Sequence, residues 1–237
     1  MRSLRVLSIV AACVGVVGSA NAVILFSQPS DTAIGGTVIG SYSEALSQGG
    51  TSSSVTQADN FTVGSGGWNV SKIRFWGFSD AAGTPGYPDL TNFSAFEVNV
   101  LTISNTGVGT VIQGGVVPKA SFTITPTGNV GGLGGYEYEF ELNVNFNLAA
   151  GAYFLNVGAV EVAANGAGDW WAWSASDTGD DQFAFNSDFT SSGWNSFQGT
   201  NMAFEIEGDT VNAVPEPFTM ALGLGAAGAY IRRRRRK

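Results

Sequence analysis

Alternating carboxylates are the residues in this sequence best suited to acid–base chemistry. Glu205 and Glu207 are two positions apart, and Glu137, Glu139 and Glu141 repeat that spacing. In an extended strand such side chains share one face, with Cβ atoms roughly 6.5 Å apart. Glycosidases place two carboxyl groups about 5–5.5 Å apart for retention or about 6.5–9.5 Å apart for inversion. The spacing therefore allows a glycosidase, although alternate charged residues also serve to keep the outer face of a strand hydrated.

A second group of carboxylates falls in one short stretch, Ser-Asp-Thr-Gly-Asp-Asp-Gln at 176–182. Asp177, Asp180 and Asp181 could supply oxygen ligands to Ca²⁺, which takes six to eight of them. Their spacing differs from that of an EF-hand loop. The alternative is an acidic surface turn, because Asp favours turns through local hydrogen bonds. Apart from this calcium candidate, the sequence predicts no metal or cofactor.

Tryptophans form the third candidate, in Asp-Trp-Trp-Ala-Trp-Ser-Ala at 169–175. As a strand, this stretch places Trp171 and Trp173 on one face and Trp170 on the other. An exposed indole can stack on a sugar ring, and Asp169 could accept hydrogen bonds from its hydroxyl groups. The alternative is that these large aromatic side chains fill a core. Asp169 and Trp170 are therefore the candidate glycan contacts.

The elements that must position these residues are strands, because the hydrophobic period is two. The clearest example runs from Tyr136 to Phe146, where aromatic and aliphatic residues alternate with Glu and Asn. We expect one long strand with Tyr136, Tyr138, Phe140, Leu142, Val144 and Phe146 on a buried face. Glu137, Glu139, Glu141, Asn143 and Asn145 should then lie on a hydrated face.

Similar stretches recur along the chain, separated by turn-forming residues. They predict strands at 23–27, 34–41, 55–63, 69–78, 94–103, 108–113, 119–125, 136–147, 152–162, 169–175, 182–186 and 202–208. No window has the pattern of an amphipathic helix. Many short antiparallel strands of this kind favour an all-β fold, a two-sheet antiparallel sandwich resembling a jelly roll.

Charge and composition exclude several classes of function. Residues 23–213 contain three basic and eighteen acidic residues, a net charge of −15. Nucleic-acid binding is excluded, because it requires clustered Lys and Arg. The same segment has no His and no Cys, which excludes Ser-His-Asp and Cys-His nucleophiles and an ordinary zinc site. About 190 residues are enough for one domain with a core that is stable without disulfides.

The N-terminus has the pattern of a secretory signal peptide. Arg2 and Arg5 precede an apolar stretch that is too short to span a bilayer, and an Ala-x-Ala site follows at Ala20 and Ala22. We therefore expect an N-terminal signal helix that is cleaved after Ala22. The alternative is lipidation of Cys13, which ends the lipobox-like sequence Val-Ala-Ala-Cys.

The C-terminus combines a Pro-Glu-Pro motif with a short apolar stretch and a basic run. The apolar stretch, 218–231, is 14 residues long, about 21 Å as a helix against a hydrocarbon core of about 30 Å. The six consecutive Arg and Lys residues that follow can snorkel and should keep that end in the cytoplasm. We expect a short C-terminal membrane helix with the preceding domain outside.

The tail resembles the PEP-CTERM sorting signal of bacterial exported proteins. The resemblance covers about 24 residues, and only Phe218 departs from it, because a small polar residue is common there. It implies recognition by an exosortase-type membrane transpeptidase, with a sorting signal formed by Val214, Pro215, Glu216, Pro217, Arg232, Arg233, Arg234, Arg235 and Arg236. It also implies a product at the cell surface or in the extracellular matrix, beside exopolysaccharide. The alternative is a plain C-terminal membrane anchor.

These observations predict a signal peptide at 1–22, an exported β-sandwich at 23–207, a tether at 208–213 and a sorting tail at 214–237. The expected function is structural or adhesive, not enzymatic, in a protein that is transiently anchored in the inner membrane and then delivered outside. A carbohydrate-binding module, assisted by calcium, is the alternative, and a carboxylate-based glycosidase is a third interpretation. The expected partners are the transpeptidase, extracellular polysaccharide and the membrane.

Overall fold

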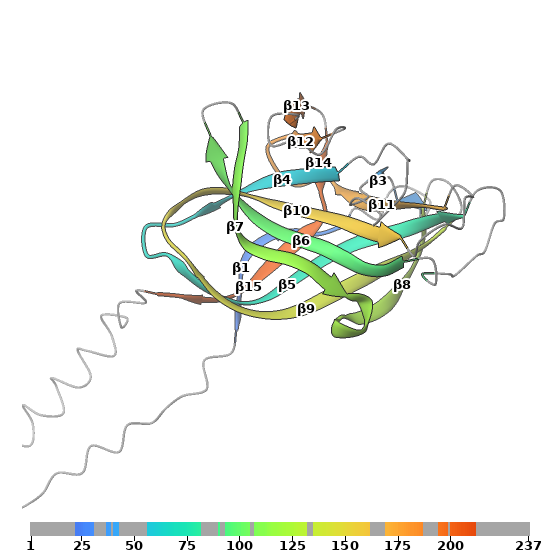
Figure 1. The fold of residues 1–237 in the computed structure, drawn as a ribbon, viewed down its shortest axis with the longest axis horizontal. Helices are drawn as coiled ribbons and strands as arrows, with labels where there is room; N and C mark the ends of the chain where they lie inside the picture. The colour runs from blue at the N-terminus through green and yellow to red at the C-terminus, as the bar shows by residue number, and fades with distance from the viewer. Residues whose placement is uncertain are drawn as a thin grey trace, which may run out of the picture.

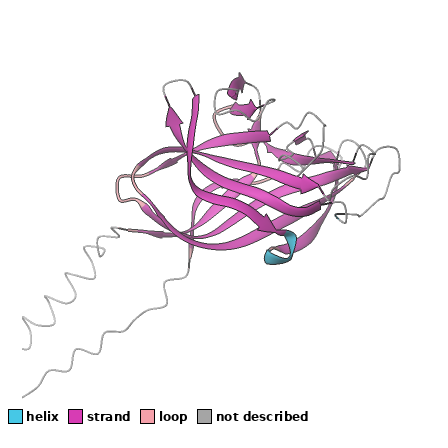
Figure 2. Ribbon diagram, viewed as in Figure 1, coloured by secondary structure: helices cyan, strands magenta, loops and turns pink. Residues whose placement is uncertain are grey.

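The chain folds almost entirely into β-strands arranged in two sheets (Figures 1 and 2). The computed structural model describes residues 22–30, 37–38, 40–42, 56–81, 90, 93–104, 107–131, 135–161, 169–186, 194–198 and 200–211. These ranges include a 3-10 turn, η2 (Lys119–Ser121). The predicted all-β, two-sheet architecture is confirmed.

The first sheet has nine strands. Along its main path the order is β1 (Val23–Gln28), β15 (Phe204–Thr210), β5 (Trp68–Ala81), β9 (Tyr136–Leu148), β8 (Thr123–Gly131) and β2 (Thr37–Val38). After the part of β5 that pairs with β15, the same edge of β5 pairs with β11 (Asp169–Ser176). β11 also pairs with β3 (Gly40–Tyr42) and with β14 (Asn201–Met202). Pairing is antiparallel except between β2 and β8.

The second sheet has six strands and is antiparallel throughout its described pairs. Its order is β13 (Trp194–Gln198), β12 (Gln182–Asn186), β4 (Thr56–Val63), β10 (Gly151–Glu161), β6 (Phe93–Ser104) and β7 (Gly107–Pro118). Successive strands pass repeatedly between the sheets, since β4, β6 and β10 belong to this sheet while β5, β9 and β11 belong to the other. Turns therefore connect the two layers at both ends of the sandwich.

The predicted strand positions differ from the structure in several places, and β7 (Gly107–Pro118) and β8 (Thr123–Gly131) both continue past their predicted ends at 113 and 125. Residues 119–121 form η2 instead of strand, so the strand expected at 119–125 begins only at Thr123. The strand expected at 34–41 corresponds to β2 and β3, and part of its range lies outside the described residues. Ala203 separates β14 from β15 where one strand was expected, and the pattern did not predict β13. β15 continues to Thr210, inside the range expected to be a tether.

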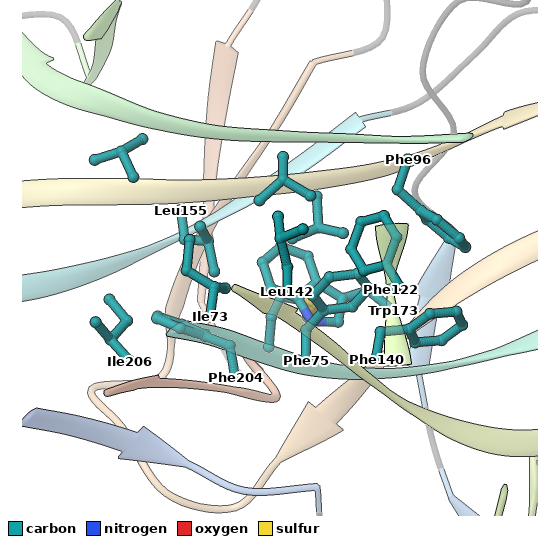
Figure 3. Close-up of a cluster of buried hydrophobic side chains, with 14 of the residues drawn as sticks. Ile73, Phe75, Phe96, Phe122, Phe140, Leu142, Leu155, Trp173, Phe204 and Ile206 are labelled. Carbon is teal, nitrogen blue, oxygen red and sulfur yellow. The ribbon is translucent and has the colours of Figure 1, made fainter. Parts of the chain in front are cut away.

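Aromatic side chains from both sheets fill the space between them (Figure 3). Phe75 of β5 stacks on Phe140 of β9 with ring centroids 5.0 Å apart, and Phe96 of β6 reaches Phe140 at 4.7 Å. Trp171 and Trp173 are fully buried in the same cluster. Burying an apolar side chain of this size contributes about 1.5–3 kcal/mol. The core is large enough for the domain to use no disulfide, as expected from its lack of Cys.

The two terminal segments contain the predicted signal helix and the predicted membrane helix, and both lie outside the described residues. Within the part of the chain that the structure describes, no helix has the length and hydrophobicity needed to cross a bilayer. β1 begins and β15 ends at the same end of the sandwich, because Val23 is paired with Gly208 (Figure 1).

Candidate functional site

The alternating carboxylates of the sequence meet on the outer face of the nine-stranded sheet. β5 carries two cations, Lys72 and Arg74, and lies between β9 and β15. The register places Arg74 between Glu141 of β9 and Glu205 of β15, and it places Lys72 beside Glu207. Strand pairing thus forms a charge ladder, which we define as Lys72, Arg74, Glu139, Glu141, Glu205 and Glu207.

Arg74 is the centre of the charge ladder. Its guanidinium nitrogens lie 2.6 Å from Glu205 Oε2, 2.7 Å from Glu207 Oε1, 3.1 Å from Glu139 Oε1 and 3.4 Å from Glu141 Oε2. Lys72 Nζ adds contacts of 2.9 Å to Glu141 and 3.5 Å to Glu207. Glu205 also accepts a hydrogen bond of 2.7 Å from Ser27 Oγ of β1. The ladder links β5, β9 and β15, and the hydrogen bond from Ser27 extends this connection to β1.

Ion pairing in the ladder favours the charged forms of Lys72 and Glu141. The hydrogen bond from Lys72 lowers the pKa of Glu141, and the same contact raises the pKa of Lys72. A general acid in a glycosidase needs the opposite shift, a carboxyl pKa raised so that the group holds its proton near neutral pH. Glu205 and Glu207 both contact the cations of β5, and this geometry supports charge neutralisation between strands.

Glu137 corrects the expectation that its whole row of side chains is hydrated. It has no exposed surface, whereas Tyr136, expected to be buried, is 38% exposed. Ser30 Oγ and Ser174 Oγ donate to Glu137 Oε1, the latter over 2.7 Å. Thr127 Oγ1 and Asn129 Nδ2 each donate to Oε2 over 2.8 Å. The donors come from β8, from β11 and from Ser30, two residues after the end of β1, and all four are neutral.

Asp59 is a buried carboxylate that we did not single out from the sequence. It lies on β4, on the inner face, and it accepts hydrogen bonds from Met202 N over 2.6 Å and from Asn60 N over 2.7 Å. The Met202 bond joins the two sheets, since β14 pairs with β11. Burial raises the pKa of Asp59 to about 7, against the lowering effect of these two hydrogen bonds, and nearby Asp180 adds to the increase. The sequence signal that could have identified Asp59 as buried is its alternation with Phe61 and Val63, which places all three on one face of the strand.

The acidic loop, defined as Asp177, Asp180 and Asp181, lies between β11 and β12, and its three carboxylates are exposed. Asp180 accepts from Asn60 Nδ2 over 3.0 Å, and Asp181 accepts from Asn201 Nδ2 over 3.2 Å. No group of three or more acidic, His or Cys side chains among the described residues is arranged to hold a metal ion. The loop packs closely on the sandwich, because a Cβ at Gly179 would lie 2.3 Å from both Gln28 Nε2 and Asn201 Oδ1.

Trp171 and Trp173 belong to the core, as the packing interpretation predicts. Both have no exposed surface, and Trp173 Nε1 donates to Ala203 O over 2.8 Å. The candidate glycan contacts Asp169 and Trp170 begin β11, where they pair with Ala81 and Asp80 of β5. Their side chains lie outside the described residues. The same applies to the cleavage site at Ala20 and to every residue of the sorting tail, and Ala22 is exposed before β1.

Comparison with protein-family models, curated proteins and solved structures gave no match to this chain.

Proposed function

We propose that this chain is an exported structural or adhesive protein of the bacterial cell surface, delivered through its C-terminal tail and associated with exopolysaccharide. The order of elements at the C-terminus carries the proposal. A folded β-sandwich ends at Thr210, and Pro-Glu-Pro begins five residues later, followed by an apolar run and six basic residues. That order matches the PEP-CTERM resemblance, in which an exosortase-type transpeptidase processes the tail.

Commitment of the acidic side chains to internal contacts favours a structural role over catalysis. Glu139, Glu141, Glu205 and Glu207 are held by the two cations of the charge ladder, and Glu137 is held by four neutral donors. These were the carboxylates with spacing suited to glycoside hydrolysis. An acidic, rigid sandwich suits a hydrated polysaccharide layer, where its net charge keeps it soluble.

Two finer features of the architecture belong to the same proposal. The repeated crossing of consecutive strands between sheets supports a jelly-roll-like winding. The apolar run at 218–231 and the six basic residues after it support a short membrane helix before processing. The signal-peptide pattern at 1–22 supports export of the domain.

The sorting proposal is tested by the fate of the tail. The full-length chain is produced in a bacterium that carries an exosortase-type transpeptidase, and its C-terminus is determined by mass spectrometry in membrane, surface and medium fractions. We expect the unmodified chain to lose its tail and leave the inner membrane. Glu216→Ala should keep its tail and remain there, while Thr219→Ala, a change outside the motif, should be processed normally. Equal processing of both variants would contradict the proposal.

The acidic loop favours a second candidate, a calcium-assisted carbohydrate-binding module. Three carboxylates stand exposed in one loop, and the adjacent Gln28 is 3% exposed, with its Oε1 lacking a hydrogen-bond partner among the described residues. Carboxylate and amide oxygens are the kind of ligand that Ca²⁺ takes. The test is a glycan array with the full-length protein in detergent, with calcium or with a chelator, comparing the unmodified chain with Trp170→Ala and with Asp180→Asn. Binding that needs calcium and both residues would establish this function.

A further inference from the structure

One end of the sandwich is almost free of charge. It contains the beginning of β1, the end of β15, the β4–β5 and β9–β10 turns and the β6–β7 hairpin, which the strand registers bring together. Figure 1 shows these turns on the side where β1 starts and β15 ends. We call it the uncharged end and define it as residues 23–24, 61–71, 101–104, 107–113, 145–155 and 208–211.

Asp209 is the one charged residue in those ranges, although residues 23–213 carry eighteen acidic and three basic residues. Charges begin immediately inward, where Lys72 and Glu207 start the charge ladder. The opposite end differs, because Asp80, Glu161 and Asp169 lie at the far termini of β5, β10 and β11. The charged residues of the domain are therefore distributed unevenly along its long strands, and they lie away from the uncharged end.

Exposed apolar side chains gather at the uncharged end. Nine large apolar residues among those described are exposed, and six belong to this end, each between 40% and 60% exposed: Val23, Ile24, Ile103, Val111, Ile112 and Val211. The turns between them consist of small uncharged residues, Gly-Ser-Gly-Gly at 64–67 and Ala-Ala-Gly at 149–151. Val23, Ile24 and Val211 lie where β1 meets the end of β15, and Ile103, Val111 and Ile112 lie on the β6–β7 hairpin, so one end of the domain offers two groups of exposed apolar side chains to a partner or a membrane.

The chain itself indicates that this partner is a bilayer. The apolar run that begins at Phe218 lies seven residues beyond Val211, so even a fully extended connection holds the two within about 25 Å. β9 alone has 13 residues, about 43 Å of strand, so the opposite end can stand well away from the surface. Electrostatic repulsion between the acidic domain and anionic lipid is weakest when the uncharged end faces the lipid.

We propose that the uncharged end rests on the lipid surface while the tail is inserted, so that the sandwich stands on the membrane with its acidic end outward. This inference rests on the proposed function, because it requires the tail to reach a bilayer. Contact with lipid holds the domain in one orientation and keeps the Pro-Glu-Pro segment close to the membrane, where a membrane-embedded enzyme works. It assigns a role to exposed apolar residues that neither the core nor the charge ladder uses.

The test uses the chain without its predicted signal peptide, residues 23–237, which contain no Cys, reconstituted into vesicles of phosphatidylethanolamine with a minor share of phosphatidylglycerol. An environment-sensitive fluorophore is attached to a single cysteine introduced by Ala150→Cys at the uncharged end, Thr125→Cys far from it, or Leu224→Cys in the tail. Lipids that carry a quencher at the headgroup report proximity. We expect quenching at position 150 to be several-fold stronger than at 125, with strong quenching at 224.

The tail label separates failure of this inference from failure of the proposed function. Quenching at 224 with equal, weak quenching at 150 and 125 would overturn the inference alone. No quenching at 224 and none at 150 would overturn both, whereas quenching at 150 without 224 would support the lipid contact and overturn the role of the tail. As a further check, Val23→Asp with Val211→Asp should remove the quenching at 150, and Val130→Asp at the opposite end should leave it unchanged.

Discussion

Glu137 and Glu141 are four residues apart on the same strand and belong to the same alternating row, yet their charges are stabilised differently. Glu141 is partly exposed and lies 2.9 Å from Lys72 and 3.4 Å from Arg74. Glu137 has no exposed surface and accepts hydrogen bonds from three hydroxyl groups and one amide. Ion pairing holds one carboxylate, and neutral hydrogen bonds hold the other.

The neighbouring strand accounts for the difference. β5 places Arg74 beside Glu141 but Phe78 beside Glu137, so a cation is adjacent in one case and an aromatic ring in the other. Cations on an open sheet face can pair while both partners retain some water. A carboxylate that is fully covered must have its lone pairs filled by donors, because burying an unpaired charge is very costly. For Glu137 and Glu141, the residue on the neighbouring strand and the degree of burial together decide how the carboxylate is stabilised.

The largest expected effect comes from removing the buried carboxylate. Glu137→Ala leaves four donors without their acceptor in a covered site, and breaking such a network should lower the free energy of unfolding by about 3–5 kcal/mol. Glu139→Ala, two residues along, removes one partly exposed contact with Arg74 and should cost about 0.5 kcal/mol or less. Urea denaturation followed by tryptophan fluorescence measures both. Equal losses in the two variants would show that burial does not separate the two groups.

The same strand shows how far the sequence could predict the fold. Its period of two correctly predicted a strand at 136–147 and placed Phe140 and Leu142 in the core, because that signal depends only on local alternation. The alternation could not predict that segments distant in the sequence cover Glu137, since Ser30 and Ser174 are brought there by tertiary packing. For the charge ladder, the sequence showed each acidic pair, but the register of β5 between β9 and β15 was needed to place Arg74 at its centre.

Asp59 extends the comparison to the other sheet, and its titration tests the role of burial. Its folded-state pKa of about 7 lies above the ordinary value of 3.8, so the folded state holds a proton that the unfolded state loses first. The contribution of protonated Asp59 to the free energy of unfolding is therefore fully present below about pH 4. It is lost as the pH rises through about 7. From about pH 5 to pH 8 the loss should be about 2.5 kcal/mol.

Asp59→Asn removes this titration and should flatten the pH dependence by about that amount relative to the unmodified chain. The quantity to compare is the slope of the free energy of unfolding against pH. The absolute stability also changes, because the new amide places an N–H against one of the two backbone donors and so lowers stability at every pH. Asp177→Asn neutralises an exposed carboxylate in the acidic loop and should leave the slope unchanged. A slope in Asp59→Asn equal to that of the unmodified chain would assign the pH dependence to other groups.

Arg74→Met tests the ion-paired side of the comparison. It leaves four carboxylates with only Lys72 nearby, and we expect a loss of about 2 kcal/mol at low salt, because the group is partly exposed and solvent screens the remaining repulsion. About 0.5 M NaCl should recover part of that loss, since Glu139 and Glu141 are partly exposed and their repulsion is open to screening. The loss in Glu137→Ala should not recover, because unfilled hydrogen bonds do not respond to ionic strength. A loss in Arg74→Met that is independent of salt would mean that packing of the Arg side chain, not its charge, stabilises the sheet.

The smallest expected effect separates burial from charge at Asp59. Burial is the largest cause of its raised pKa, and the nearby carboxylate of Asp180 is a lesser one. Asp180 accepts from Asn60 Nδ2 and from Gln182 N. Asp180→Asn removes the charge and one of these two acceptors, so the midpoint of the Asp59 transition should fall by roughly 0.5 pH unit or less. NMR titration of the Asp59 carboxyl carbon measures the midpoint, with Asp177→Asn as the matched control.

A fall of several units would mean that repulsion from the acidic loop sets the pKa, and Asp59 would then belong with the charge ladder as a group governed by neighbouring charges. A small fall would place it beside Glu137, as a carboxylate whose behaviour follows from being covered.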